Sequence, residues 1–350
     1  MVTSIDLKLA MYPQVFYTGF LCLLGLCCLG FNDSLLPANA LVPASQRWQA
    51  KSTPTIAPAE NLNDAASYYI RGFARYNDGD LKGAIEDFSQ ASILDPGYVE
   101  AYLYRGFVRS QQGDRDGAIA DYNLAIELDG DRASAYFYRG LAGNPNAIAD
   151  FDRAIELDPD YTEAYRHRSI ARRQQGDLSG ALADSDRAIS LNPDYADAYY
   201  TRGNVRIDLE DYSGAIIDFN QAISLQGFYP EAYISLGIAR EKQGDLQGAF
   251  DAYSQAIELD PDSAIAYYNR GILHAQLGNY QKAIANFTAA IDIDPNYAEA
   301  YFNRGAVRNN QIGDLPGAIA DLQTAADLYQ QQDNSAAAGH ALDRLRAISP

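Results

Sequence analysis

Apolar residues recur at intervals of three and four along most of the chain, which is the period of amphipathic helices. Gly72 on the first such stretch and Ala84 on the second are small, so the two helix axes can approach closely. Gly79 between them suits the left-handed end of a helix, and Asp80 suits the N-cap of the next one. Pro96 stops the second helix. The pattern predicts a hairpin of two helices, here named helix A and helix B.

The same hairpin recurs along the chain, usually after 34 residues. A tyrosine occupies the fourth place of every unit, at Tyr68, Tyr102, Tyr136, Tyr165, Tyr199, Tyr233, Tyr267 and Tyr301. The eight units run 65–98, 99–132, 133–161, 162–195, 196–229, 230–263, 264–297 and 298–331, and the third is five residues short. One such hairpin cannot bury its apolar face alone, so neighbouring units must stack.

The period and the aromatic fourth place resemble the tetratricopeptide repeat family, over residues 65 to 331. The resemblance implies an all-α fold, a right-handed superhelical solenoid of eight helix–turn–helix units. After the last unit, residues 335–349 carry Ala338, Leu342 and Leu345 on one stripe. This stretch predicts a C-terminal capping helix that covers the final hairpin.

A charged pair accompanies the repeat. Arg precedes the small residue of helix A in seven units, at Arg71, Arg105, Arg139, Arg168, Arg202, Arg270 and Arg304. Asp occupies a matching place of helix B in six, at Asp87, Asp121, Asp150, Asp184, Asp218 and Asp321. The sixth unit has lost both charges, with Leu236 and Ala252 in their places. We infer an Arg–Asp contact between helices A and B, because an Arg fork pairs a carboxylate bidentately. The alternative is a charged track for a ligand.

The family binds peptides in a concave groove lined mainly by helix A, and the resemblance assigns groove positions here. The fifth places are Tyr69, Leu103, Phe137, Arg166, Tyr200, Ile234, Tyr268 and Phe302. The ninth places include Phe73, Phe107, Ile170, Asn204, Ile238 and Ile272. Such rows form an apolar strip suited to an apolar or helical segment of a partner protein. The alternative is that these side chains pack between neighbouring helices.

One helix departs from the acidic character of the rest of the chain. Four Arg and one His occur between Arg166 and Arg173, directly after the shortened third unit. Arg166 and Arg173 are seven residues apart and share a helix face, so they predict a site for a partner's carboxylate or phosphate. The alternative is local pairing with Asp177, Asp184 and Asp186.

The sequence of the N-terminus predicts a targeting segment. Residues 15–31 form an uncharged apolar run, slightly short for a membrane span, and Ala38-Asn39-Ala40 fits a signal-peptidase site. We expect residues 1–40 to be a signal peptide, whose cleavage would remove all three Cys. The alternative is an uncleaved membrane anchor formed by residues 15–31. Residues 41–64 read as a flexible linker. The expected location is the periplasm, or the thylakoid lumen if the source is photosynthetic.

Charge and motif content narrow the function. The formal net charge of −19 argues against binding of nucleic acid. The three His lie in two different units and in the capping helix, and no catalytic, metal-binding or cofactor-binding motif is present. The leading hypothesis is a non-enzymatic scaffold that binds a protein or peptide partner, with contact to a membrane only through an uncleaved N-terminus. The alternatives are a self-assembling homo-oligomer and an enzyme with an unrecognised site.

Overall fold

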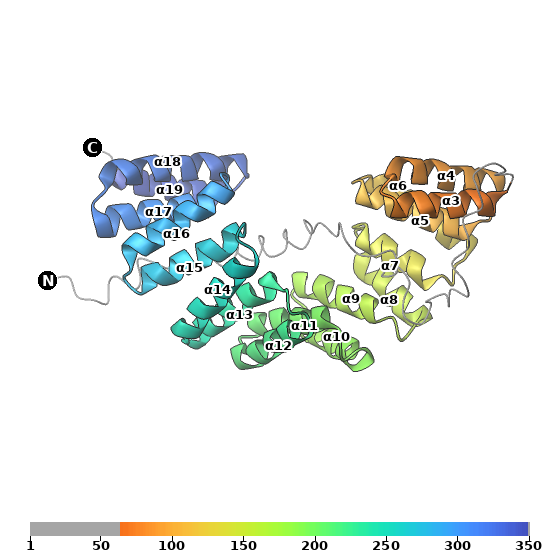
Figure 1. Ribbon diagram of the computed structural model, residues 1–350, viewed down its shortest axis with the longest axis horizontal. Coiled ribbons are helices and arrows are strands. Elements are labelled where there is room, and N and C mark those ends of the chain that lie inside the picture. The colour runs from red at the N-terminus through yellow and green to blue at the C-terminus, as the bar shows by residue number, and fades with distance from the viewer. Residues whose placement is uncertain (1–63, 349–350) are drawn as a thin grey trace. The chain divides into compact units, whose positions relative to one another are not determined.

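The computed structural model describes residues 64–348, and the predicted signal peptide, the alternative anchor and residues 41–63 of the linker lie outside them. Within the described residues the chain forms 17 α-helices and one π-helical turn, and no strand (Figure 1). None of the helices in this range is both long and apolar enough to cross a membrane. The predicted all-α class of successive helical hairpins is confirmed.

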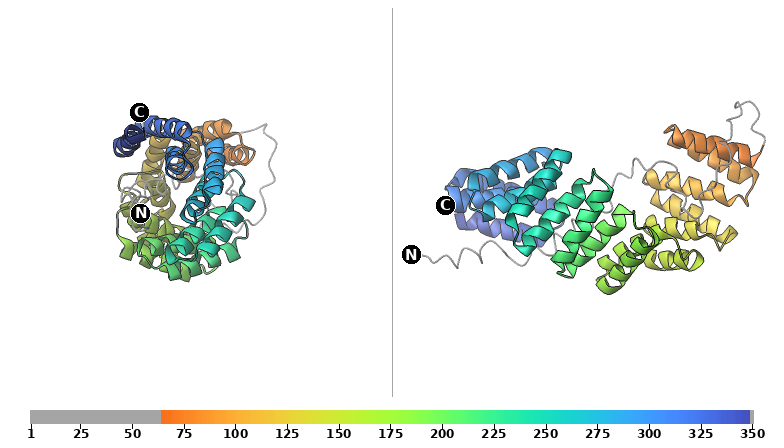
Figure 2. Two further views of the ribbon diagram at one scale, coloured as in Figure 1. Left: turned by 90° about the vertical axis from the view of Figure 1, so that its left-hand side faces the viewer. Right: turned by 60° about the horizontal axis from the view of Figure 1, so that its bottom comes forward.

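The described residues fall into two compact units, 64–205 and 206–348. The N-terminal unit contains α3 (Ala65–Asn77), α4 (Leu81–Leu94), α5 (Val99–Gln111), α6 (Arg115–Leu128), α7 (Ala133–Leu141), α8 (Ala147–Leu157), α9 (Thr162–Gln174) and α10 (Leu178–Leu191). The boundary passes through α11 (Ala196–Asp208). The C-terminal unit contains α12 (Tyr212–Leu225), α13 (Pro230–Gln243), α14 (Leu246–Leu259), α15 (Ala264–Gln276), α16 (Tyr280–Ile293), α17 (Ala298–Val307), the π-helical turn η2 (Arg308–Ile312), α18 (Leu315–Gln331) and α19 (Ser335–Ile348). Within each unit, helices next to each other in the chain pack side by side (Figure 2).

The turn between helices A and B follows from two residues. Gly79 ends helix A with a φ of 82°, a conformation open to glycine at little cost. The Asp80 side chain then accepts a hydrogen bond of 2.9 Å from the backbone N–H of Gly83, which caps α4. The same Asp cap recurs at Asp114, Asp177, Asp211, Asp245 and Asp314. Six helices B therefore begin in the same way.

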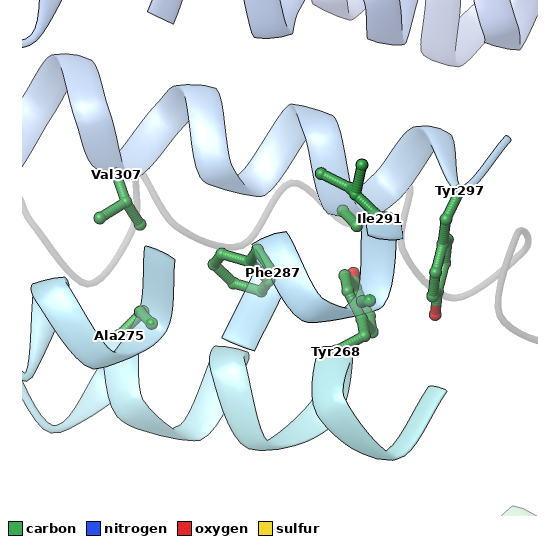
Figure 3. Close-up of a cluster of buried hydrophobic side chains, with 9 residues drawn as sticks. Tyr268, Ala275, Phe287, Ile291, Tyr297 and Val307 are labelled. Carbon is green, nitrogen blue, oxygen red and sulfur yellow. The ribbon is translucent and has the colours of Figure 1, made fainter. Parts of the chain in front are cut away.

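The core of six of the eight hairpins centres on one large aromatic ring of helix B. Phe88, Tyr122 and Phe287 are at most 1% exposed, and each lies in a hydrophobic cluster that includes buried alanine. Figure 3 shows Phe287 pointing into the space among α15, α16 and α17. A Cβ on Gly72 would lie 2.9 Å from the Phe88 ring, so this ring, and not the expected Ala84, is its closest neighbour. The glycine of helix A makes room for an aromatic ring.

The two irregular repeats have separate solutions. The third repeat has a helix A of nine residues, and Arg115 of the second repeat donates hydrogen bonds to the backbone carbonyls of Ala142 and Gly143 at its end. These bonds satisfy carbonyls that a short helix leaves unpaired. In the eighth repeat the π-helical turn absorbs one additional residue before the Asp314 cap.

The last helix covers the final hairpin. Ala338 and Ala341 of α19 are buried beside Leu322 and Phe302, and Leu342 packs against the same cluster. The apolar stripe that predicts a capping helix faces this core.

Close packing around the glycines makes a prediction for Gly237→Ala. The added methyl would lie 2.4 Å from the buried Tyr253 ring, so we expect a loss of about 1–3 kcal/mol in the free energy of unfolding. Gly339→Ala in α19 is the matched control, because a Cβ there meets no atom within 4 Å and Ala favours a helix by up to about 1 kcal/mol. Urea unfolding measures both variants, and equal stabilities would contradict the packing argument.

Candidate functional site

One arginine of helix A ties three helices together. The Arg105 guanidinium donates to both carboxylate oxygens of Asp121 in its own repeat, with 2.6 Å between Nη2 and Oδ1. Its Nη1 donates to Ser92 on helix B of the preceding repeat at 3.0 Å. The guanidinium also lies over the Tyr102 ring, 5.2 Å from its centroid. We name this arrangement the arginine clamp. It consists of one Arg and one Tyr of helix A and one Asp of helix B, and several repeats add a second Arg that contacts the same Asp.

The clamp recurs through both units. The Arg–Asp distances are 2.5 Å for Arg71–Asp87, 2.5 Å for Arg139–Asp150, 2.6 Å for Arg168–Asp184 and 2.8 Å for Arg304–Asp321. The predicted contact between helices A and B is confirmed in these repeats. The link to the preceding repeat was missed, and it joins Arg139 to Asn123, Arg168 to Asp152, Arg202 to Asp186 and Arg304 to Thr288. The fourth-place tyrosines thus serve as platforms for these arginines.

A second arginine, four residues after the first, completes the clamp. Arg109 donates to Asp121 at 2.8 Å and to the Gly117 carbonyl at 3.4 Å. Arg75, Arg172, Arg206 and Arg308 reach the corresponding Asp in their repeats. The signal for it was the spacing of four, which places both arginines on one helix face.

Burial decides between the two interpretations of the charged pair. The clamp carboxylates of Asp87, Asp121 and Asp321 are at most 3% exposed, and each faces two guanidinium groups. Their hydrogen-bonding capacity is used inside the protein. The clamp therefore holds helices in place, and nothing in this geometry supports a track for a charged ligand.

The structure places most predicted fifth-place residues in the core. Leu103, Phe137, Ile234, Tyr268 and Phe302 are buried, each in a hydrophobic cluster between helices. Tyr69 is partly buried against the cluster around Phe88, Tyr200 is partly buried, and the ninth-place Asn204 is buried. These positions show the packing between helices that the sequence left open as the alternative.

The ninth places differ from the fifth in exposure. Phe73 and Phe107 of the N-terminal unit are partly exposed, and so are Ile238 and Ile272 of the C-terminal unit. The Phe73 ring stands edge-on to Tyr104, and the Phe107 ring edge-on to Tyr138. Solvent reaches these side chains, whereas most fifth places are buried.

The basic helix α9 is largely paired within the protein. Arg168 and Arg172 both contact Asp184, and Arg168 also pairs with Asp152. Arg166 donates to the Tyr195 hydroxyl at 2.8 Å and lies over the same ring. Local pairing, the alternative to an anion site, thus accounts for Arg168 and Arg172.

His167 and Ser169 lie on the core side of the same helix, and Ser169 meets Ser185 of α10. His167 is partly buried against the rings of Phe137 and Phe151. Burial, with the Arg166 charge, holds the pKa of His167 below its usual value. Ser169 and Ser185, which replace the small residue and the aromatic ring of other repeats, share a hydrogen bond of 2.7 Å.

In the described part of the chain no three His, Cys, Asp or Glu side chains gather closely enough to hold a metal ion.

The clamp predicts strong coupling between Arg105 and Asp121. Removing Asp121 alone leaves two partly buried guanidinium groups without their carboxylate, so Asp121→Ala should cost about 3 kcal/mol of unfolding free energy. A double-mutant cycle with Arg105→Ala should give a coupling of about 1–3 kcal/mol. The exposed pair Arg346–Asp343 is the control, with a coupling of at most about 1 kcal/mol. A coupling near zero for Arg105 and Asp121 would contradict a stabilising role of the clamp.

The lowered pKa of His167 predicts a dependence of stability on pH. The unfolded state binds a proton at this residue near pH 6.5, and the folded state binds it only at lower pH. Stability from this residue is therefore complete above about pH 6.5 and falls below it by up to about 1.4 kcal/mol per pH unit. His167→Tyr, which places the residue of Tyr104 and Tyr138 there, should flatten the profile between pH 7.5 and 5, whereas exposed His340→Asn should not. Denaturant unfolding across this range measures the difference, and identical profiles would refute it.

Solved structures that are similar to this chain include three named proteins. Yeast Tom70 has a TM-score of 0.57 and 19% identity, over 85% of this chain and 67% of Tom70, which shows the fold alone. The MamA protein is 30% identical over 47% of this chain and 93% of its own, with a TM-score of 0.42. YrrB, described as a TPR protein with an unusual peptide-binding site, is 27% identical over 55% of this chain and 97% of its own, with a TM-score of 0.42.

Sequence comparison reaches the same family. None of the curated protein sequences gives a significant match. A tetratricopeptide repeat profile matches residues 69–133, 200–264, 234–298 and 268–333, and a TPR repeat profile matches residues 171–209. These matches cover more than half of the chain and coincide with the helical hairpins that carry the clamp. The chain belongs to the tetratricopeptide repeat family.

Proposed function

We propose that this protein is a non-enzymatic scaffold that binds segments of partner proteins on the helix A faces of its repeats. The observation that carries the proposal is the row of partly exposed apolar ninth-place residues, Phe73 and Phe107 in one unit and Ile238 and Ile272 in the other. Membership of a family of protein-interaction modules supports the same function. An apolar or helical segment is the ligand whose chemistry matches such a row.

The support beneath this row favours binding by a preformed surface. Phe137 and Tyr268 at fifth places are buried in hydrophobic clusters, and the Arg139–Asp150 pair of the clamp lies in the repeat of Phe137. A rigid base lowers the entropy cost of binding, because fewer side chains are ordered when the partner arrives. The face is thus built as a binding surface with no demand for catalytic groups.

We further propose that the chain acts outside the cytoplasm. The support is the sequence of the N-terminus, with the apolar run 15–31 and the cleavage site at Ala38-Asn39-Ala40. Cleavage after Ala40 releases the mature chain into the periplasm, or into the thylakoid lumen of a photosynthetic source. An uncleaved N-terminus would instead anchor the repeats to the membrane.

Photo-crosslinking in the producing cells tests both proposals. A benzophenone amino acid at Phe107 or Ile238 should give discrete adducts with other proteins. The same probe at Ile93 or Ile217, which are 68% and 67% exposed on helices B, is the matched control and should give few. Mass spectrometry of the adducts should show a chain that begins at Leu41.

Other outcomes decide against particular parts. Adducts only from Ile93 and Ile217 would overturn binding on helix A, and adducts joining two copies of the chain would favour the self-assembling alternative. A chain that retains residues 1–40 would overturn cleavage and leave the anchor in its place.

A further inference from the structure

The seventh repeat keeps the clamp arginine but lacks the carboxylates that neutralise it elsewhere. Arg270 faces Asn286 where other repeats have Asp, and His274 replaces the second arginine. Asn279 replaces the Asp cap and makes no capping hydrogen bond, and Lys282 replaces the glycine after it. Two negative charges are lost, and Lys282 restores the positive charge that is lost with the second arginine, within a chain that is strongly acidic.

These four replacements depend on one another. In the first and sixth repeats a Cβ on Gly83 or Gly248 would lie 2.1 or 2.0 Å from the carboxylate of the capping Asp and 2.9 Å from the Cδ atom of the second arginine. In the seventh repeat Asn279 makes no capping hydrogen bond and His274 is shorter than arginine, which makes room for the Lys282 side chain. In the first and sixth repeats the second arginine donates a hydrogen bond to the backbone carbonyl of the matching glycine. In the seventh repeat the Lys282 carbonyl accepts a hydrogen bond of 2.8 Å from the Asn286 side-chain amide instead. The repeat is rebuilt around a different balance of charge.

Arg270 forms no ion pair with any carboxylate of the described residues. Its Nε donates to the Asn286 amide oxygen at 2.9 Å, and its Nη1 has only a 3.3 Å contact with the Ser254 hydroxyl. Burial lowers the pKa of Arg270, whereas the Asp87 carboxylate raises that of Arg71. Partial burial of a guanidinium without a carboxylate costs free energy, which an oxyanion bound beside it would offset.

One further polar atom lies one helical turn after Arg270 on α15 and lacks a partner. The His274 Nδ1 atom is buried and makes no hydrogen bond within the described residues, in a residue that is 7% exposed. Besides burial, the Arg270 and Lys282 charges lower the pKa of His274, so both cations act on this ring. Lys282 is exposed and Arg270 is partly exposed, which leaves a route from solvent.

We propose that Arg270, His274 and Lys282 form an oxyanion site that takes a carboxylate group of a partner protein, in place of the absent Asp. The planar fork of Arg270 matches a carboxylate, and Lys282 supplies a second positive charge. The identity of the partner as a protein rests on the proposed function, but binding of the anion itself does not. The site uses helix A and helix B positions distinct from the fifth- and ninth-place rows.

Side-chain NMR of the full-length protein tests the site without any partner. Sodium acetate is titrated against sodium chloride at constant ionic strength, and the Arg270 Nε–Hε resonance should shift saturably. Asn286→Asp restores the internal carboxylate of the other repeats and should weaken acetate binding at least tenfold. Lys282→Gly, the residue of most other repeats, should weaken it several-fold, and Lys82→Ala in the first repeat should leave it unchanged.

Three results would overturn the proposal. They are no saturable shift in the unmodified protein, equal affinity in the Asn286→Asp variant, and tighter binding of inorganic phosphate than of acetate in a parallel titration. The last would reassign the site to a phosphate group. Failure of the helix A crosslinks would leave these titrations unaffected, so the two proposals fall separately.

Discussion

The arginine clamp is the interaction on which the order of these repeats depends. A single guanidinium, such as that of Arg105, contacts an Asp in its own hairpin, a polar residue in the preceding hairpin and a tyrosine ring one turn earlier. It therefore fixes the angle within a hairpin and the stacking between hairpins with one side chain. The hydrophobic clusters supply most of the favourable free energy, but they are non-directional. The clamp adds the direction.

The clamp also explains how an acidic chain can bury charge. Each fully formed clamp places one carboxylate between two guanidinium groups, as Asp121 lies between Arg105 and Arg109. A buried carboxylate in such a pair is costly to expose or to leave alone, because desolvation is repaid only when every partner is present. The sixth repeat shows the consistent alternative, since Leu236 and Ala252 are both apolar and both buried. The seventh repeat is the departure, because it keeps Arg270 and changes the residues around it.

The fifth-place and ninth-place rows of helix A differ in their exposure to solvent. Fifth-place residues such as Phe137 lie close to the axis of contact between helices and become core. Ninth-place residues such as Phe107 lie one turn further along helix A and keep part of their surface exposed. Helix A thus carries one partly exposed apolar row and one largely buried row. The α9 helix adds a contrast, because most of its charge is consumed by Asp184 and Asp152 within the protein.

Local signals in the sequence determined the hairpin, its period and the Arg–Asp pairing within it. Gly79 and Asp80 act on the backbone within one turn, so these residues alone specify where helix A ends and helix B begins. The recurrence after 34 residues repeats this local signal along the chain. Only the tertiary structure decided that Gly72 meets the Phe88 ring, that Arg105 reaches back to Ser92, and which apolar rows are core. These contacts depend on how one hairpin lies against the next, which periodicity does not encode. The sequence also showed that Asn286 departs from the pattern, but the unpartnered Nδ1 atom of His274 emerges only when the helices are packed.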